Sequence, residues 1–125
     1  MTLDLQPVNT PMLTTTASLG ERRIVVQISG TADNETKPDL DRYIKQLHAE
    51  AVRHTVTAVE LDLRQLEFMN SSSFKILIAW LAQIRDLDAA AQYKLQIRSN
   101  PNLLWQRRGL AALSCFAVDL VTIET

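Results

Sequence analysis

The sequence is poor in glycine and cysteine, and each shortage excludes a class of site. Only three glycines occur among 125 residues, so the chain lacks the glycine-rich loops that hold the phosphates of nucleotides and dinucleotides. Cys115 is the only cysteine and cannot form an internal disulfide. Its apolar neighbours predict a buried thiol in a reducing compartment.

The sequence also lacks an excess of charge of one sign and any long apolar run. The formal net charge is -1 and no basic stretch is interleaved with aromatic residues, so we expect no binding of nucleic acid. No stretch approaches the length that spans a membrane. Asp4, Gln6 and Pro7 stand where a signal peptide needs apolar residues. These absences predict a cytoplasmic protein that does not insert into membranes.

Patterns for catalysis and metal binding are missing as well. Ser71 lacks the flanking glycines of a hydrolase nucleophile. His48 and His54 are six residues apart on an expected helix, so they do not share one face as a metal-binding pair would, and we expect both to be solvated. No nucleophile, base and orienting group can be assembled. We therefore expect no enzymatic activity, no cofactor and no metal.

The chain does contain strand patterns that alternate with helix patterns. With 46% hydrophobic and 22% charged residues, its composition fits one domain, for which we assign residues 13–125, after an irregular lead-in over residues 1–12. The expected strands cover residues 12–18, 24–28, 58–63, 93–97 and 117–123, and the expected helices cover residues 38–53, 71–87 and 101–108. This alternation predicts an α/β fold with parallel crossovers after an initial hairpin.

The most informative segment lies at the start of the second expected helix. A strand pattern leads into Glu67-Phe68-Met69, and Asn70 followed by three serines opens a strongly apolar helix. The first amides of a helix have no intrahelical partner and lie at the positive end of its dipole, so the fold would tolerate a phosphate on a serine there. Serines at a helix start also fit plain capping, and both interpretations stay open.

The apolar arc of this expected helix is wide. Ile76, Trp80 and Leu87 extend it to about 200°, which is more than one sheet can easily cover. Either a neighbouring helix covers the extra stripe, for instance the one expected after Pro101, or the stripe binds a partner or a second copy of the chain.

Two motifs together resemble the STAS domain family, whose best-known soluble members are bacterial anti-sigma factor antagonists. Asn70-Ser71-Ser72-Ser73-Phe74 resembles the family's Asp-Ser-Ser-Gly-Leu at a helix start. Asn100-Pro101 and Gly109-Leu110 resemble a second pattern, in which Asn-Pro precedes a short helix that ends in Gly-Leu. The resemblance covers roughly residues 13–123. It implies a mixed β-sheet of four to five strands with the helices packed mainly on one face.

The resemblance implies a cytoplasmic bacterial regulator of transcription that acts in signal transduction by partner switching. Such a module binds an anti-sigma factor or GHKL-type serine kinase when unmodified, is released when the kinase phosphorylates it, and has a PP2C-type phosphatase as a further partner. Ser71 matches the family's phosphoacceptor, and Ser72 is a second candidate because the serines are adjacent. A weak homodimer also stays open.

The same resemblance implies a partner surface made from the loop after the second strand and the start of the central helix. The candidate residues are Gly30, Thr31, Asp33, Asn70, Ser71, Ser72, Ser73, Lys75, Ile76 and Trp80. Asn70 stands where the family usually has aspartate, and Lys75 adds a charge that could pair with a phosphate. STAS-like proteins also serve as accessory subunits of membrane lipid-transport ATPases, an alternative in which the serine is not phosphorylated.

Overall fold

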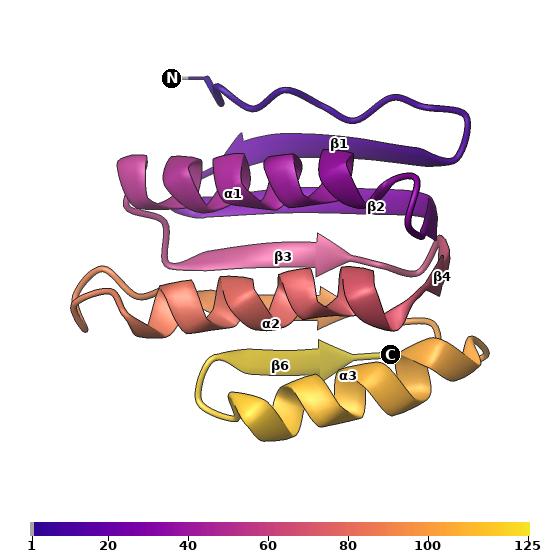
Figure 1. Ribbon diagram of the computed structural model, residues 1–125. Coiled ribbons are helices and arrows are strands. Elements are labelled where there is room, and N and C mark those ends of the chain that lie inside the picture. The colour runs from indigo at the N-terminus through magenta and orange to yellow at the C-terminus, as the bar shows by residue number, and fades with distance from the viewer. Residues whose placement is uncertain (1) are drawn as a thin grey trace.

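The computed structural model describes residues 2–125 as a mixed sheet covered by three helices (Figure 1). The elements follow in the order β1 (Leu13–Gly20), β2 (Arg23–Ala32), α1 (Lys37–Arg53), β3 (Ala58–Asp62), β4 (Leu66–Met69), α2 (Ser71–Arg85), β5 (Lys94–Arg98), α3 (Leu104–Phe116) and β6 (Val121–Glu124). The main path of the sheet is β1-β2-β3-β5-β6. β1 and β2 are antiparallel, whereas the other neighbours are parallel. The predicted α/β fold is confirmed, and the short β4, which pairs with β2, adds a sixth strand.

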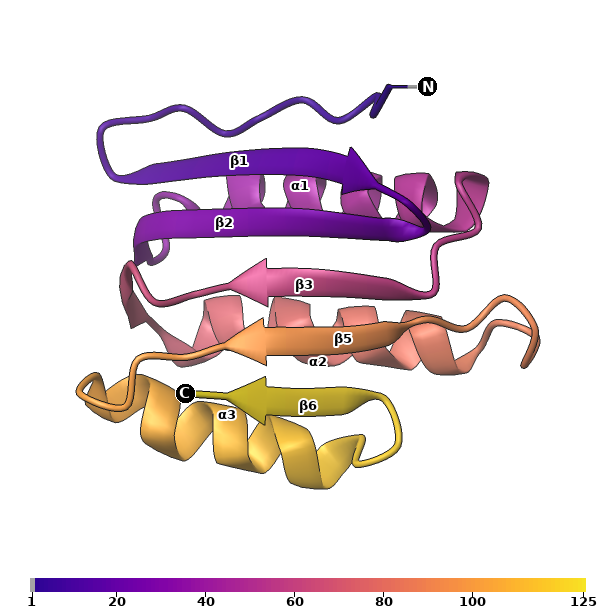
Figure 2. The same ribbon diagram turned by 180° about the vertical axis from the view of Figure 1, so that it is seen from behind.

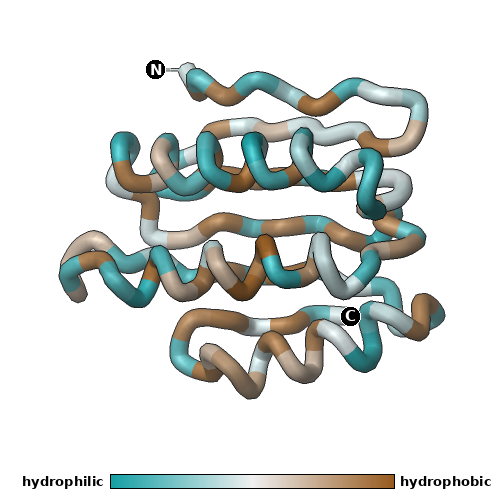
Figure 3. Tube along the Cα trace, viewed as in Figure 1, coloured by the Kyte–Doolittle hydropathy of each residue, from teal (hydrophilic) through white to brown (hydrophobic). Residues whose placement is uncertain are grey.

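All three helices lie on one face of the sheet, as the views from the two sides show (Figures 1 and 2). Strand β2 explains this arrangement, because successive side chains of a strand point to opposite faces. Ile24, Val26 and Ile28 are buried on the helix side, whereas Gln27 is exposed on the other side. The outward turns of α1 are hydrophilic, whereas β3, which passes between α1 and α2 in this view, is largely hydrophobic (Figure 3). The predicted packing of the helices on one face is confirmed.

The wide apolar arc of α2 is covered by helices on both sides. Trp80 is 1% exposed and its Nε1 donates to the Tyr93 hydroxyl at 2.7 Å, in the layer between α1 and α2. On the other side, a Cβ added at Gly109 of α3 would lie 3.2 Å from the Phe74 ring. The structure therefore favours the first interpretation of the arc, with α1 contributing to the cover as well as α3.

The last helix and strand begin later than predicted. Asn100, Pro101 and Asn102 form a turn in which the Asn100 side chain accepts from the Asn102 amide at 3.0 Å, so α3 begins only at Leu104. Gly109 does not end the helix, which continues through Phe116, and β6 starts at Val121. The predicted boundaries of residues 101–108 and 117–123 are therefore wrong. Cys115, predicted to be buried, lies on the exposed side of the longer helix.

The two histidines are not the solvated residues that the sequence predicts. His48 is half-buried, and its Nδ1 lies 2.7 Å from the Tyr93 hydroxyl. The side chain of His54 is 3% exposed and lies beside Glu50. Within residues 2–125, no group of three His, Cys, Asp or Glu side chains could hold a metal ion. No helix in the described part of the chain has the length and apolar character to cross a membrane.

Residues 2–12 precede the first strand and run along β1 (Figures 1 and 2). Asn9 forms an isolated bridge with Thr14, and Val8 is 2% exposed among the core residues. Further back, the Asp4 amide donates to Oε1 of Glu50 on α1 at 2.6 Å. This segment is irregular in structure but fixed by specific contacts.

Candidate functional site

The serine triplet occupies the first turn of α2, and Asn70 is its N-cap. Oδ1 of Asn70 accepts from the Ser73 amide at 2.8 Å, which satisfies one of the unpaired donors of a helix start. Nδ2 of the same side chain donates to Oδ1 of Asn34 at 3.0 Å. A carboxylate could make the first bond but not the second, because it has no proton to donate. Asn70 therefore caps α2 and also ties it to the loop after β2.

The three serines lie in three different environments. Ser71 is exposed, and its hydroxyl takes no part in the side-chain hydrogen bonds found among residues 2–125. Ser72 is half-buried and its Oγ accepts from Nζ of Lys37 at 2.7 Å. Ser73 is fully buried and donates to the Asp33 carbonyl oxygen at 3.4 Å. Ser71 is thus the member of the triplet that presents a free hydroxyl to the solvent.

The loop between β2 and α1 lies directly against this helix start. The Asn70 amide donates to the Ala32 carbonyl oxygen at 2.9 Å. Within the loop, the Asp33 carboxylate accepts from the Thr36 amide at 3.2 Å, and the Thr36 hydroxyl donates to the Thr31 carbonyl oxygen at 3.0 Å. The structure therefore brings together the loop after β2 and the start of α2, the two segments that the STAS resemblance implies as one partner surface.

Gly30 sets the direction in which this loop leaves β2. Its φ of +110° is a backbone conformation that residues with a side chain rarely adopt. A Cβ added at this position would also overlap the Met12 carbonyl oxygen. That oxygen accepts from the Thr31 amide at 2.8 Å, while Thr31 is paired with Phe68 of β4. Met12 and Phe68, which are 43% and 47% exposed, therefore place apolar side chains on either side of Thr31.

The remaining candidate residues are placed differently. Lys75 is exposed on α2, about one helical turn after Ser71. Trp80, Ile76 and Ser73 are 1%, 7% and 0% exposed, respectively, so they support the core and do not form part of the surface. Ser73 packs against the loop after β2 and Trp80 against Tyr93 on the side of α1. The apolar pattern of α2 does not show which elements cover it.

Sequence patterns missed Lys37, Met12 and Phe68. Lys37 lies 35 positions before Ser72 and meets it only because α1 and α2 run side by side with their first turns adjacent (Figure 1). Phe68 carried a weak signal, since it lies in the short segment just before the serine triplet, between Leu66 and Met69. Met12 carried none, because its place depends on the pairing of β1 with β2.

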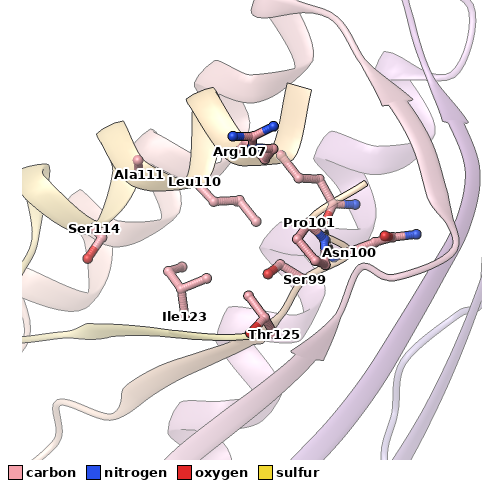
Figure 4. Close-up of a pocket in the computed structure, with 10 residues that line it drawn as sticks. Ser99, Asn100, Pro101, Arg107, Leu110, Ala111, Ser114, Ile123 and Thr125 are labelled. Carbon is pink, nitrogen blue, oxygen red and sulfur yellow. Dashed lines mark hydrogen bonds between the residues drawn. The ribbon is translucent and has the colours of Figure 1, made fainter. Parts of the chain in front are cut away.

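A cavity of about 440 Å³ lies elsewhere, between α3 and β6 (Figure 4). Leu110 and Ala111 line it from the helix, and Ile123 lines it from the strand. Arg107 is the only charged side chain among its lining residues, and none of these belongs to the serine triplet or the loop after β2. The cavity has no pair of acid and base groups that would support catalysis.

Comparisons with known proteins agree with the fold. No protein-family model matches the sequence, and no curated protein matches it. The chain is similar to an anti-sigma factor antagonist from Mycobacterium paratuberculosis, with a TM-score of 0.67 and 22% identity over 94% of this chain and 90% of that chain.

Two further solved structures share the arrangement. The Bacillus cell fate determinant SpoIIAA in its phosphorylated form has a TM-score of 0.56 and 18% identity, over 89% of this chain and 91% of that chain. The anti-sigma factor antagonist SpoIIAA in its unphosphorylated form has a TM-score of 0.50 and 18% identity, over 89% and 88%. The fold is therefore that of the anti-sigma factor antagonists, as the STAS resemblance predicts.

Proposed function

We propose that this chain is a regulatory binding module of the anti-sigma factor antagonist type, and that phosphorylation of Ser71 releases its partner. The observation that carries the proposal is the exposed Ser71 hydroxyl at the start of a buried helix, beside the loop after β2. The fold shared with anti-sigma factor antagonists, one of them phosphorylated, supports it. The expected partner is an anti-sigma factor or GHKL-type serine kinase, and a PP2C-type phosphatase restores the free serine.

The modification adds a phosphoryl group to one hydroxyl. Ser71 Oγ attacks the γ-phosphorus of a nucleoside triphosphate, the bond to the bridging oxygen breaks, a base of the kinase takes the hydroxyl proton, and the nucleoside diphosphate leaves. The product carries about -1.5 to -2 charges. The free amides and positive dipole of the α2 start tolerate that charge, so the fold is preserved.

The same charge opposes a docked partner, because a phosphate beneath an interface loses its hydration without gaining a matched cation. We assign the contact surface to Thr31 and Asp33 from the loop and to Asn70, Ser71 and Lys75 from the helix start. Apolar contact area would come from Met12 and Phe68, which flank Thr31. Because Ser71 belongs to this assigned surface, a partner docked on its helix-start residues would cover the Ser71 hydroxyl.

Variants at Ser71 test the switch. Affinity-tagged Ser71→Ala is expected to recover the partner from the native host as the unmodified protein does, and Ser71→Asp to recover at least about tenfold less, since it adds a permanent charge. Ser18→Asp, an exposed serine on the open sheet face, is the matched control and should bind normally. Equal recovery by Ser71→Asp and Ser71→Ala would exclude Ser71 as the switch.

No observation favours the alternative role as an accessory subunit of a lipid-transport ATPase. A broad apolar face around Trp80 would suit that role and the switching role equally, and the structure buries Trp80.

A further inference from the structure

The first turn of α1 contains a lysine where local electrostatics disfavours a cation. Lys37 is the first residue of α1, at the positive end of the helix dipole. The ion pairs of residues 2–125 do not include it. Asp33 and Asp39 lie near the same turn, but the Asp33 carboxylate accepts from the Glu35 and Thr36 amides instead. Helix stability therefore does not explain Lys37.

The ammonium group of Lys37 instead reaches across to α2. Its Nζ lies 2.7 Å from Ser72 Oγ. Lysine is only a donor, so Ser72 must accept this bond with an oxygen lone pair. The neighbouring Ser71 hydroxyl is exposed and Ser73 is buried against the Asp33 carbonyl oxygen. The Ser71 hydroxyl is therefore free, the Ser72 hydroxyl is bound to a cation, and the Ser73 hydroxyl is buried in the core.

We propose that Lys37 determines which serine of the triplet is modified, by holding Ser72 toward α1 and leaving Ser71 as the acceptor. This deepens the proposed function and rests on it. An attacking serine must direct a lone pair at phosphorus while a base removes its proton. The Lys37 ammonium occupies a lone pair of Ser72 and withdraws electron density from it. It also fixes the side chain in a rotamer directed at a neighbouring helix rather than at the solvent.

The contact can be measured without a kinase by using cysteine as the probe. Cys115 is the only cysteine, so Ser71→Cys and Ser72→Cys in a Cys115→Ser background each present one thiol. A neighbouring ammonium stabilises the thiolate and lowers the pKa of the thiol. We expect Lys37→Gln to slow the reaction of the Ser72→Cys thiol with iodoacetamide at pH 7 by about three- to tenfold. The Ser71→Cys thiol should change by less than about twofold.

Three controls separate charge from structure. Lys37→Arg should retain the fast reaction of the Ser72→Cys thiol, because it retains the cation. Lys75→Gln removes the exposed lysine of α2 near the triplet and should leave that rate unchanged. Lys37→Gln should not lower the urea midpoint of unfolding, because a cation at a helix start is unfavourable. An unchanged rate for the Ser72→Cys thiol in Lys37→Gln, or equal slowing of both thiols, would overturn the role of Lys37.

Peptide mass spectrometry of protein from the native host distinguishes a failure of this proposal from a failure of the proposed function. We expect phosphate on Ser71 alone in the unmodified sequence, and on both Ser71 and Ser72 in Lys37→Gln. Phosphate on Ser72 in the presence of Lys37 would contradict selection by Lys37 but leave phosphorylation of the triplet in place. Absence of phosphate from both proteins would overturn the proposed function, and acceptor selection with it.

Discussion

The side-chain amide of Asn70, at the start of α2, makes two hydrogen bonds with different roles. Asn70 accepts from the Ser73 amide with one end of its side chain and donates to Asn34 with the other. The first bond stabilises the helix, and the second aligns the loop after β2 with the serine triplet. Capping residues are selected mostly for the first task, so the second gives a reason for asparagine at this position.

Substitution of Asn70 separates the two tasks. Asn70→Ala removes the cap, so it should lower the free energy of unfolding by about 1 kcal/mol. Asn70→Asp keeps the cap and adds a favourable charge at the helix start, so it should stay within about 0.5 kcal/mol of the parent. Urea denaturation measures both, with the exposed α2 residue Gln83→Ala as control. A fully stable Asn70→Ala would show that this cap does not contribute.

At this scale the sequence predicts residues whose roles are local. The capping role of Asn70 and the exposed hydroxyl of Ser71 follow from their positions at a helix start. The burial of Ser73 and the bond from Lys37 to Ser72 do not, because both depend on elements that lie 35 or more positions away. No periodicity within α2 contains that information.

Helices α1 and α2 are joined by a chain of hydrogen bonds with a defined direction. The Trp80 indole can only donate, so the Tyr93 hydroxyl accepts from it. Because this hydroxyl is buried, its own proton needs an acceptor, and Nδ1 of His48 at 2.7 Å provides one. This arrangement requires a neutral imidazole that carries its proton on Nε2. Burial lowers the pKa of His48 and raises the pKa of Tyr93, so both groups remain uncharged at neutral pH.

The requirement for a neutral His48 in these hydrogen bonds predicts a pH dependence of stability. The pKa of His48 is lower in the folded protein than in the unfolded chain. The contribution of His48 to the free energy of unfolding is therefore complete above a pH of about 6.5. It is lost as the pH falls from that value through the folded pKa, since the unfolded state binds the proton more readily. Urea unfolding between pH 5 and pH 8 should show this loss in the parent and a weaker slope in His48→Gln. Identical slopes would contradict it.

Tyr93→Phe tests the middle of this series of hydrogen bonds. It leaves the buried Trp80 N–H without an acceptor, and we expect a loss of about 1–3 kcal/mol in the free energy of unfolding. His48→Gln in the same background should then have little further effect at pH 7.5, because the link to Trp80 is already absent. Additive losses would show that the two residues act independently.

Elements with long periodic patterns are predictable from this sequence, and short ones are not. The strand at residues 58–62 and the helices that start at Lys37 and Ser71 match their apolar patterns. β4 has only four residues, and its existence depends on pairing with the end of β2. The start of α3 is misplaced because proline is common in a first helical turn, whereas Asn100 here draws the chain into a turn instead.

At the scale of the whole molecule, Glu50 joins the N-terminal segment to the helix layer. Its carboxylate accepts from the Arg53 side chain through two bonds of 2.8 Å and from the Asp4 amide at 2.6 Å. The hydrogen bonds from Arg53 are the main reason that the pKa of Glu50 is lowered to about 2. One buried carboxylate therefore holds the beginning of a segment that has no regular secondary structure.

Removal of this charge should loosen the segment in a pH-dependent way. The stabilisation by Glu50 is complete above its unfolded pKa of about 4.3 and is lost as the pH falls toward 2. Glu50→Gln should therefore cost about 1–2 kcal/mol at pH 7, a value that allows for the exposure of Arg53, and the difference should shrink below pH of about 4. Hydrogen exchange of the Asp4 amide should quicken. Exposed Glu35→Gln is the control, and a difference that persists unchanged to pH 2 would refute the assignment.

The two edges of the sheet differ, and this difference affects which edge could pair with a strand of another molecule. Along β1 the segment of residues 2–12 occupies the edge, whereas within residues 2–125 no strand lies beyond β6. A sheet with two open edges can extend without limit into a fibre. With residues 2–12 lying along it, β1 is shielded from strand addition by a second molecule.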